Sequence, residues 1–195
     1  MDANELRIIK IECVTKLQNI NLRVIAEITD MGTDYQKAAK KLGITEEIPY
    51  YIVNNQKIFY FFDPPHLIKA ARNNLLNNVI KSGDKIMSWQ YIEKLFEIDK
   101  ENINRLVPKL AQDTHIYPNN FQRMKVKYAA QVLSFSVASA INTMTALGHL
   151  PASAKDTSEY IEKLDAAFDI FSSSSVKGKK SSRNAFVASE KQVKY

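Results

Sequence analysis

The sequence predicts an α/β segment over residues 1–82, an all-α segment over residues 83–172 and a disordered basic tail over residues 173–195. Two changes of pattern support this division. The first segment alternates helical periodicity with short runs of aromatic and β-branched side chains, which are typical of strands, and beyond Gly83 the apolar periodicity is helical throughout. From Ser173 onward Ser and Lys dominate, a composition that offers little apolar surface to bury.

The first segment begins with helix, strand and helix. These elements are expected over residues 6–17, 22–28 and 35–42. The strand ends at Thr29-Asp30, and the second helix can be capped by Thr33 or Asp34 and closed by Gly43. Cys13 is the single cysteine, and its place in the first helix favours a buried structural thiol.

Two β-like runs follow, over residues 50–53 and 57–62. They are separated by Asn54-Asn55-Gln56, which is turn chemistry, so we expect a hairpin. Pro64 and Pro65 cannot continue a sheet interior but suit the first turn of a helix. A helix is therefore expected over residues 66–78.

The second segment is predicted to contain helices alone. They are placed at residues 88–98, 102–110, 119–147 and 153–171. The longest of them ends at Gly148, with Pro151 just beyond. The boundary between the two segments is expected at Ser82-Gly83.

The composition excludes some classes of protein. A chain of 195 residues with 45% hydrophobic and 25% charged side chains is ordinary for a globular protein. No apolar run reaches the roughly 18 to 20 residues that cross a bilayer. No Gly-X-X-X-X-Gly-Lys-Ser/Thr string occurs, which excludes a P-loop NTPase.

The net charge is concentrated in the tail. Residues 173–195 hold five of the six net positive charges. Such a tail can be simply solvated, can touch phosphate without specificity, or can act as a nuclear import signal.

The most distinctive string runs from Phe61 to Leu76 and joins an aromatic strand, an acid, two prolines and a histidine that opens a helix. It resembles the Asp-X-Pro-His-Leu-Ile-Lys…Arg-Asn segment of P-element-type DNA transposases, a family that includes THAP-domain relatives. The resemblance spans about Leu6 to Ser172. It implies that the first segment is an incomplete RNase H-like unit and that the second is the helical GTP-binding insertion of such transposases.

Asp30 is the candidate catalytic and metal-binding residue. A carboxylate at the end of a buried strand lies where open α/β sheets present functional groups, although spacing alone favours a cap of the following turn. The resemblance of Thr-Asp-X-Gly to the second acidic position of the family implies one ligand of a two-metal Mg²⁺ site. Asp63 and His66 are expected to be framework residues of the strand-to-helix junction. Lys69 and Arg72 are candidates for contact with backbone phosphate.

The resemblance also implies a GTP site in the second segment. Its contacts are expected at Lys109, Lys125, Val126, Ser134 and Asp169, the last an acid suited to the guanine N1 and N2 donors. The family continues Phe-Asp-X-Phe-Asn, whereas this chain has Ser172, which lacks the paired donor and acceptor of an asparagine amide. Without the resemblance, the lysines read as surface residues of an amphipathic bundle.

Taken with this resemblance, the sequence predicts a fragment or domesticated remnant of a cut-and-paste transposase. We expect GTP binding, weak binding of DNA at transposon ends, homo-oligomers and no membrane contact. Localisation is expected in the nucleus, or in the cytoplasm if the tail is no import signal. Catalysis by the chain alone is not expected, because the sequence before Asp30 lacks room for the first catalytic acid and its strands. Two alternatives stay open: a non-catalytic protein-interaction module, and a nuclease completed by acids from another chain.

Overall fold

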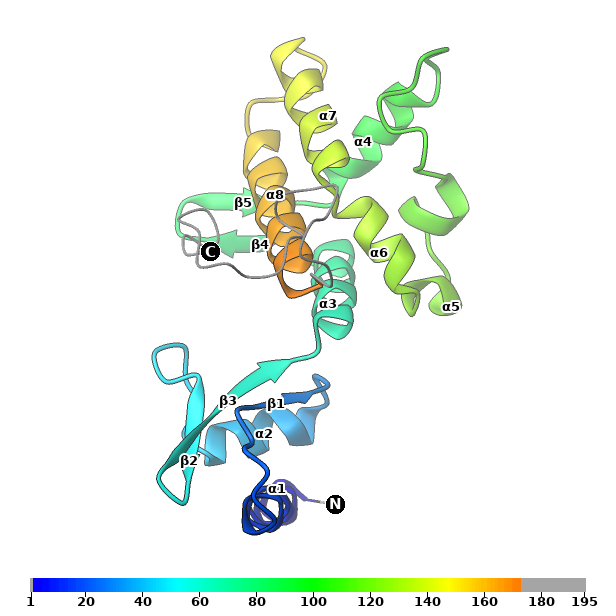
Figure 1. The fold of residues 1–195 in the computed structure, drawn as a ribbon. Coiled ribbons are helices and arrows are strands. Elements are labelled where there is room, and N and C mark those ends of the chain that lie inside the picture. Colours follow the sequence, from blue (N-terminus) through cyan, green and yellow to red (C-terminus); the bar gives the residue numbers. More distant parts are fainter. Residues whose placement is uncertain (1, 173–195) are drawn as a thin grey trace. The chain divides into compact units, whose positions relative to one another are not determined.

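The structure is a computed structural model in which residues 2–172 are described. The chain forms two compact units, one ending at Leu67 and the other beginning at Ile68 (Figure 1). The tail over residues 173–195, predicted to be disordered, lies outside the described residues. Within residues 2–172 no helix has both the length and the apolar character that a membrane span requires.

The first unit combines one small sheet with two helices. Its elements are α1 (Ala3–Asn19), β1 (Ala26–Thr29), α2 (Thr33–Lys41), β2 (Tyr50–Val53) and β3 (Gln56–Phe62). The sheet order is β1-β3-β2, with β3 parallel to β1 and antiparallel to β2. Asn54 and Asn55 take positive φ values of 48° and 60° in the connecting turn, as a tight hairpin requires. The predicted hairpin is confirmed.

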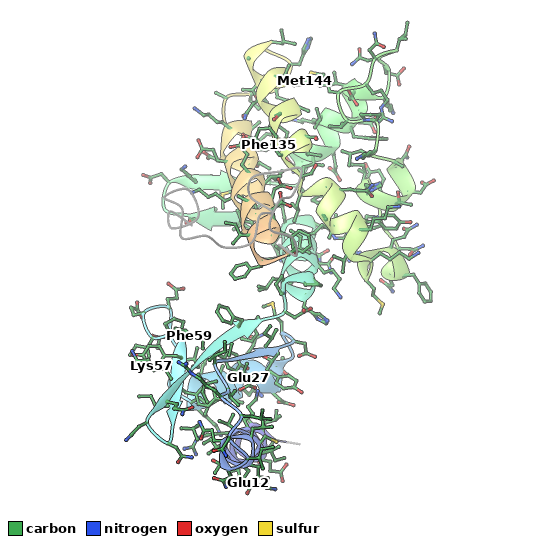
Figure 2. All side chains as sticks on the ribbon, viewed as in Figure 1. Glu12, Glu27, Lys57, Phe59, Phe135 and Met144 are labelled. Atoms are coloured by element: carbon green, nitrogen blue, oxygen red, sulfur yellow. The ribbon has the colours of Figure 1, made fainter. Side chains whose placement is uncertain are left out.

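One face of this sheet packs on the helices. Tyr51 and Ile58 of the two hairpin strands are buried against Val14 of α1 and Ala39 of α2. The period of two along each strand puts Phe59 on the opposite face, where it is exposed; Figure 2 labels it.

Cys13 is exposed, so the prediction of a buried thiol is wrong. The buried side chains of α1 are Ala3, Leu6, Lys10 and Val14. Their spacing of three and four residues defines one stripe of the helix. Cys13 lies outside this stripe, although the apolar residues Ile11 and Val14 stand close to it in the sequence.

A buried polar network joins α1 to the sheet. Lys10 Nζ forms an ion pair with Glu27 Oε1, and their side chains are 9% and 19% exposed. Tyr51 Oη donates to Glu27 Oε2 at 2.8 Å. Lys10 Nζ also lies 5.1 Å and 5.2 Å from the ring centroids of Tyr35 and Tyr60. Burial, with a smaller electrostatic contribution from Tyr60, raises the pKa of Tyr51 to about 12.

Helix α3 (Pro64–Asn77) leads the chain into the second unit, which is mainly helical. The remaining elements are β4 (Ile80–Ser82), β5 (Lys85–Met87), α4 (Gln90–Asp99), the π-helical turn η1 (Gln112–Ile116), α5 (Asn120–Arg123), α6 (Val126–Val132), α7 (Phe135–Ala146) and α8 (Ala154–Phe171). Helices α7 and α8 lie side by side, and β5 packs on α8 (Figure 1). Phe135 and Met144, labelled in Figure 2, lie near the two ends of α7. The apolar core includes Leu95 of α4, Val132 of α6 and Ile161 of α8.

The prediction that no strand follows Gly83 is wrong. Strands β4 and β5 form an antiparallel hairpin, and Gly83 lies in its turn with φ 58°. The hairpin is fixed to α8, because Ile86 N donates to Asp156 Oδ2 and Ser88 N donates to Thr157 Oγ1, each at 3.0 Å. The second segment is therefore not all-α. The domain boundary at 82/83 stays a prediction, while the compact units divide between Leu67 and Ile68.

The helix predicted over residues 119–147 is three helices. The backbone is extended at Lys125 (φ −83°, ψ 116°) and at Ser134 (φ −106°, ψ 154°), which separates α5, α6 and α7. The helix predicted over residues 102–110 is also wrong, since this segment is a loop. The loop over residues 106–110 and the break at Ser134 both line a cavity.

Candidate functional site

Asp30 and Asp63 follow the ends of neighbouring parallel strands, as predicted. Thr29 of β1 is in register with Phe62 of β3, and Asp63 N donates to Thr29 O at 2.7 Å. Asp30 Oδ1 accepts from Gly32 N at 2.7 Å and so closes the turn before α2. The carboxylate is exposed at this edge of the sheet.

At the strand-to-helix junction Asp63 caps α3, as expected of a framework residue, whereas the His66 side chain is 47% exposed and is not packed. Asp63 Oδ2 accepts from His66 N at 3.2 Å in the first turn of α3. His66 Nε2 lies 3.9 Å from the same oxygen. Across residues 2–172 no three His, Cys, Asp or Glu side chains gather closely enough to hold a metal ion. The catalytic and metal-binding role of Asp30 stays a prediction.

Arg72 is buried and cannot contact nucleic-acid phosphate, contrary to the prediction. Its side chain is 0% exposed. Nη2 donates to Arg123 O and Nε donates to Asn73 Oδ1, each at 2.8 Å. Burial, and then the charge of Arg123, lowers the pKa of Arg72. The arginine of the most distinctive sequence string therefore joins α3 to α5.

The second unit contains a cavity of about 570 Å³. This volume lies within the roughly 300 to 1,000 Å³ typical of small-molecule sites. Its walls are the loop after α4, the helices α6 and α8, and the start of α7. The lining residues are Leu106, Val107, Pro108, Lys109, Leu110, Lys127, Ala130, Gln131, Ser134, Ser136, Val137, Asp165 and Phe168.

The cavity joins an apolar base to a polar rim. Val107, Leu110 and Val137 are at most 3% exposed and supply the apolar surface. Lys109 on the loop and Lys127 on α6 are exposed and supply positive charge from two separate elements. An anionic ligand with a flat apolar part matches this distribution.

A buried carboxylate fixes the loop that carries Lys109. Asp99 is 0% exposed and accepts from Leu106 N at 2.6 Å and Val107 N at 3.2 Å. Arg105 Nε donates to Asp99 Oδ2 at 3.2 Å, and Arg105 Nη2 donates to Leu110 O at 3.0 Å. These bonds hold both ends of the 106–110 segment. They also take the Leu106 and Val107 N–H groups, which a helix over residues 102–110 would direct to the carbonyls of residues 102 and 103.

The opposite wall is fixed by a buried histidine. His115 lies in η1 and is 4% exposed. Its Nδ1 accepts from Ala111 N at 3.1 Å, and its Nε2 lies 3.0 Å from Gln131 Oε1. The ring also packs edge-on against Tyr128 at a centroid distance of 5.2 Å.

Of the five nucleotide-contact residues expected from the sequence, two line the cavity and three do not. Lys109 and Ser134 line the cavity. Lys125 and Val126 do not line it: Lys125 Nζ lies 5.6 Å from the Tyr128 ring centroid, and Val126 packs against the core. Asp169 is 1% exposed and follows Phe168, which does line the cavity.

Sequence reasoning missed Gln131 and Asp165 as cavity residues. Gln131 stands four residues after Lys127 on α6, and Asp165 stands four residues before Asp169 on α8. Residues four apart share a helix face. Helical spacing from the expected residue Asp169 was a signal for Asp165, whereas Lys127, from which Gln131 is counted, was not itself an expected contact.

Comparison with known proteins places the chain among transposase sequences. A family model described as the TNP-like, GTP-binding insertion domain matches residues 65–184. The chain is 30% identical over 161 residues to the transposable element P transposase of Drosophila melanogaster, covering 81% of the chain and 21% of that protein. It is 29% identical over 179 residues to the DNA transposase THAP9 of Homo sapiens, covering 85% of the chain and 19% of that protein.

A solved structure is also similar. The Drosophila P element transposase strand transfer complex matches with a TM-score of 0.78 and 28% identity, covering 94% of this chain and 41% of that one. The chain spans about a fifth of the length of the two curated relatives.

Proposed function

The chain belongs to the P-element-type DNA transposase family through its TNP-like GTP-binding insertion domain, and from this premise we propose that the cavity of its second unit binds GTP. One observation carries the proposal. Lys109 and Ser134 come from separate elements, both match nucleotide-contact positions by resemblance, and both line one cavity of suitable volume. Lys127 adds a second positive charge to the rim.

The lining residues suggest how the nucleotide lies. The ammonium groups of Lys109 and Lys127 suit its phosphates, because a charge-assisted contact is about twice as strong as a neutral one. The Phe168 ring offers an apolar face against a purine. By resemblance alone, Asp169 is proposed to accept from guanine N1 and N2, although it is 1% exposed and does not line the cavity. Lys125 and Val126 are proposed to flank the site at the start of α6. Ser172 replaces the asparagine of the family, so we propose weaker guanine affinity than in relatives.

Calorimetric titration of the purified chain with GTP and ATP tests the proposal. We expect saturable binding of GTP in preference to ATP. Lys109→Ala should weaken it at least about tenfold, since a charged contact contributes about 1.5–3 kcal/mol. Lys94→Ala is the matched control, because Lys94 is exposed on α4 and does not line the cavity. A folded chain that binds no nucleotide would contradict the proposal.

Two acids on α8 allow a sharper test of guanine recognition. Asp169→Asn should remove the preference for GTP over ATP, because the amide offers a donor where guanine also offers donors. Asp165→Asn should leave that preference unchanged, although Asp165 lines the cavity. The opposite result would assign guanine recognition to Asp165.

For DNA chemistry we propose a partial RNase H-like unit that is inactive alone. The parallel pairing of β1 with β3 and the strand-end position of Asp30 support this. Two-metal hydrolysis needs carboxylates from several elements, and Asp30 supplies one proposed Mg²⁺ ligand. We also propose that the chain is a remnant or part of a larger transposase, with weak DNA binding, self-association and a nuclear location. Metal-dependent nicking of plasmid DNA by the purified chain would refute the claim that it is inactive.

The second candidate function is a protein-interaction module without nucleotide. The Ser172 departure favours it, since it removes one expected guanine contact. Indifference to every nucleotide in the titration above would support it. A nuclease completed in trans remains testable by adding a full-length relative and measuring strand cleavage.

A further inference from the structure

The backbone holds His115 in one tautomer. Nδ1 accepts from Ala111 N at 3.1 Å and lies 2.8 Å from Thr114 Oγ1, whose hydroxyl can donate. A ring nitrogen that accepts from N–H carries no proton, so the neutral ring carries its proton on Nε2. The ring is 4% exposed, and its edge-on contact with Tyr128 limits its rotation.

This tautomer dictates the orientation of the Gln131 amide. With its proton on Nε2, His115 donates to Gln131 Oε1 at 3.0 Å. A flipped amide would bring N–H against N–H. The Gln131 NH₂ group is therefore the end left for another partner, and within residues 2–172 it donates no hydrogen bond. The NH₂ nitrogen of Gln131 is not a buried atom without a partner, unlike Trp89 Nε1 in the same unit.

The neighbourhood of this NH₂ group favours oxygen atoms of an anion. Gln131 and Lys127 stand four residues apart on α6 and both line the cavity. Lys109 brings a second ammonium group from the loop, and Asp165 is the acid among the lining residues. Two ammonium groups and an amide with two N–H donors match the oxygens of a phosphate group.

We propose that Gln131 contacts a phosphate oxygen of the bound nucleotide, and that His115 is a positioning residue that fixes the Gln131 amide for this contact. The inference rests on the proposed GTP site and adds two residues to it. The Ala111 N–H fixes the tautomer of His115, and this tautomer orients the NH₂ donors of Gln131.

Gln131→Glu tests the contact. Glutamate still accepts from His115 Nε2 but replaces the N–H donors by a carboxylate oxygen that repels phosphate. We expect GTP affinity to fall about tenfold or more and guanosine affinity to stay unchanged. Gln112→Glu is the matched control, since Gln112 is an exposed glutamine of η1 outside the cavity lining. It should bind GTP as the parent chain does.

A double-mutant cycle tests the role of His115. His115→Phe keeps an aromatic ring beside Tyr128 but removes the bond to Gln131. GTP affinity should fall several-fold in the parent chain and should not fall further in a Gln131→Ala background. An equal loss in both backgrounds means that His115 supports only the fold, and overturns its positioning role. ¹⁵N NMR of the unmodified chain gives a second readout, in which protonation on Nδ1 would overturn the tautomer assignment.

The outcomes separate this inference from the proposed function. If the parent chain binds no GTP, both fail. If it binds GTP and Gln131→Glu binds equally well, only this inference fails. If Gln131→Glu weakens guanosine as much as GTP, Gln131 contacts the nucleoside, and the phosphate assignment is wrong.

Discussion

The two compact units of the chain use buried polar side chains for different purposes. In the first unit Lys10, Glu27 and Tyr51 bond to one another and join α1 to the sheet. In the second unit Asp99 and His115 are also buried, but each bonds to a segment that lines a cavity. Buried polar groups are costly unless they are satisfied, so both sets constrain the structure strongly. In the first unit they constrain the relative placement of elements, and in the second unit they constrain the walls of a cavity.

The same contrast separates the distinctive sequence string from the cavity. In the string from Phe61 to Leu76, Asp63 caps α3 and Arg72 is fully buried. The cavity residues Lys109 and Gln131 lie in stretches with no such signature. The distinctive string therefore marks the strand-to-helix junction and its packing, whereas the cavity is recognised from the three-dimensional structure.

Removing Asp99 should have the largest effect and should fall on the second unit. Asp99→Ala leaves the Arg105 guanidinium and two loop N–H groups without their acceptor, so we expect a loss of about 3–5 kcal/mol. Trp89 is the single tryptophan, is buried in this unit, and reports its unfolding by fluorescence during denaturant titration. The Asp99→Ala variant should also lose GTP binding.

Asp99→Asn is the control for this prediction. Its amide oxygen can still accept from Leu106 N, so the loss should be smaller. An unchanged Trp89 transition in Asp99→Ala would show that the network does not support the unit.

Breaking the polar network of the first unit should reduce stability by a smaller amount. Trp89 fluorescence should not detect this loss, because Trp89 lies in the second unit. Glu27→Gln leaves the Lys10 ammonium nearly buried without an ion-pair partner, and we expect a loss of about 3 kcal/mol. Hydrogen exchange of the β3 amides should speed up, while the Trp89 transition stays unchanged.

A double variant sharpens this prediction. Lys10→Met with Glu27→Leu removes both charges and should recover much of the lost stability, as apolar replacement of buried pairs often does. If Glu27→Gln shifts the Trp89 transition as much as it shifts the β3 amides, the two units are not independent.

Alkaline pH should destabilise the first unit through Tyr51. Its pKa is about 12 in the folded chain, against 10.0 ordinarily, because burial disfavours the phenolate. A raised pKa stabilises the fold fully below pH 10 and loses that contribution as pH rises from about 10 to about 12. The loss should not exceed roughly 2–3 kcal/mol, at about 1.4 kcal/mol per pKa unit. Unfolding of the parent chain and Tyr51→Phe between pH 9 and pH 12 measures it, and an equal pH dependence in both would contradict the assignment.

Much of the first unit could be predicted from sequence, because its signals are local. The alternation of residues 57–62 and the turn at Asn54-Asn55 determine a hairpin, and Pro64-Pro65 determine the start of a helix. The neighbouring positions of Asp30 and Asp63 were predicted as well. Cys13 was misplaced because the apolar residues around it obscured the buried stripe of α1.

The resemblance gave Lys109 and Ser134 of the cavity lining, but the shape of the cavity could not be predicted, because its walls depend on contacts between distant residues. The 106–110 loop is shaped by Asp99, which ends the preceding helix, and not by its own propensity. The break at Ser134 lies in a run with continuous helical periodicity. One missed feature had a local signal, since Gly83 can form the turn of the β4–β5 hairpin.

Asp30 should give the smallest effect on stability, and it separates the two roles considered for this residue. Asp30→Ala removes the acceptor for Gly32 N, and we expect a loss of about 1 kcal/mol in the first unit, as for other lost caps. Asp30→Asn keeps an oxygen that can accept from Gly32 N, so hydrogen exchange of the α2 amides should remain close to that of the parent chain. The same amide has no negative charge for a divalent cation. If Mg²⁺-dependent DNA cleavage occurred in the parent chain and vanished in Asp30→Asn at unchanged stability, the carboxylate would be a metal ligand as well as a cap. If neither chain cleaves DNA, the substitution reports only the role of Asp30 in the turn before α2.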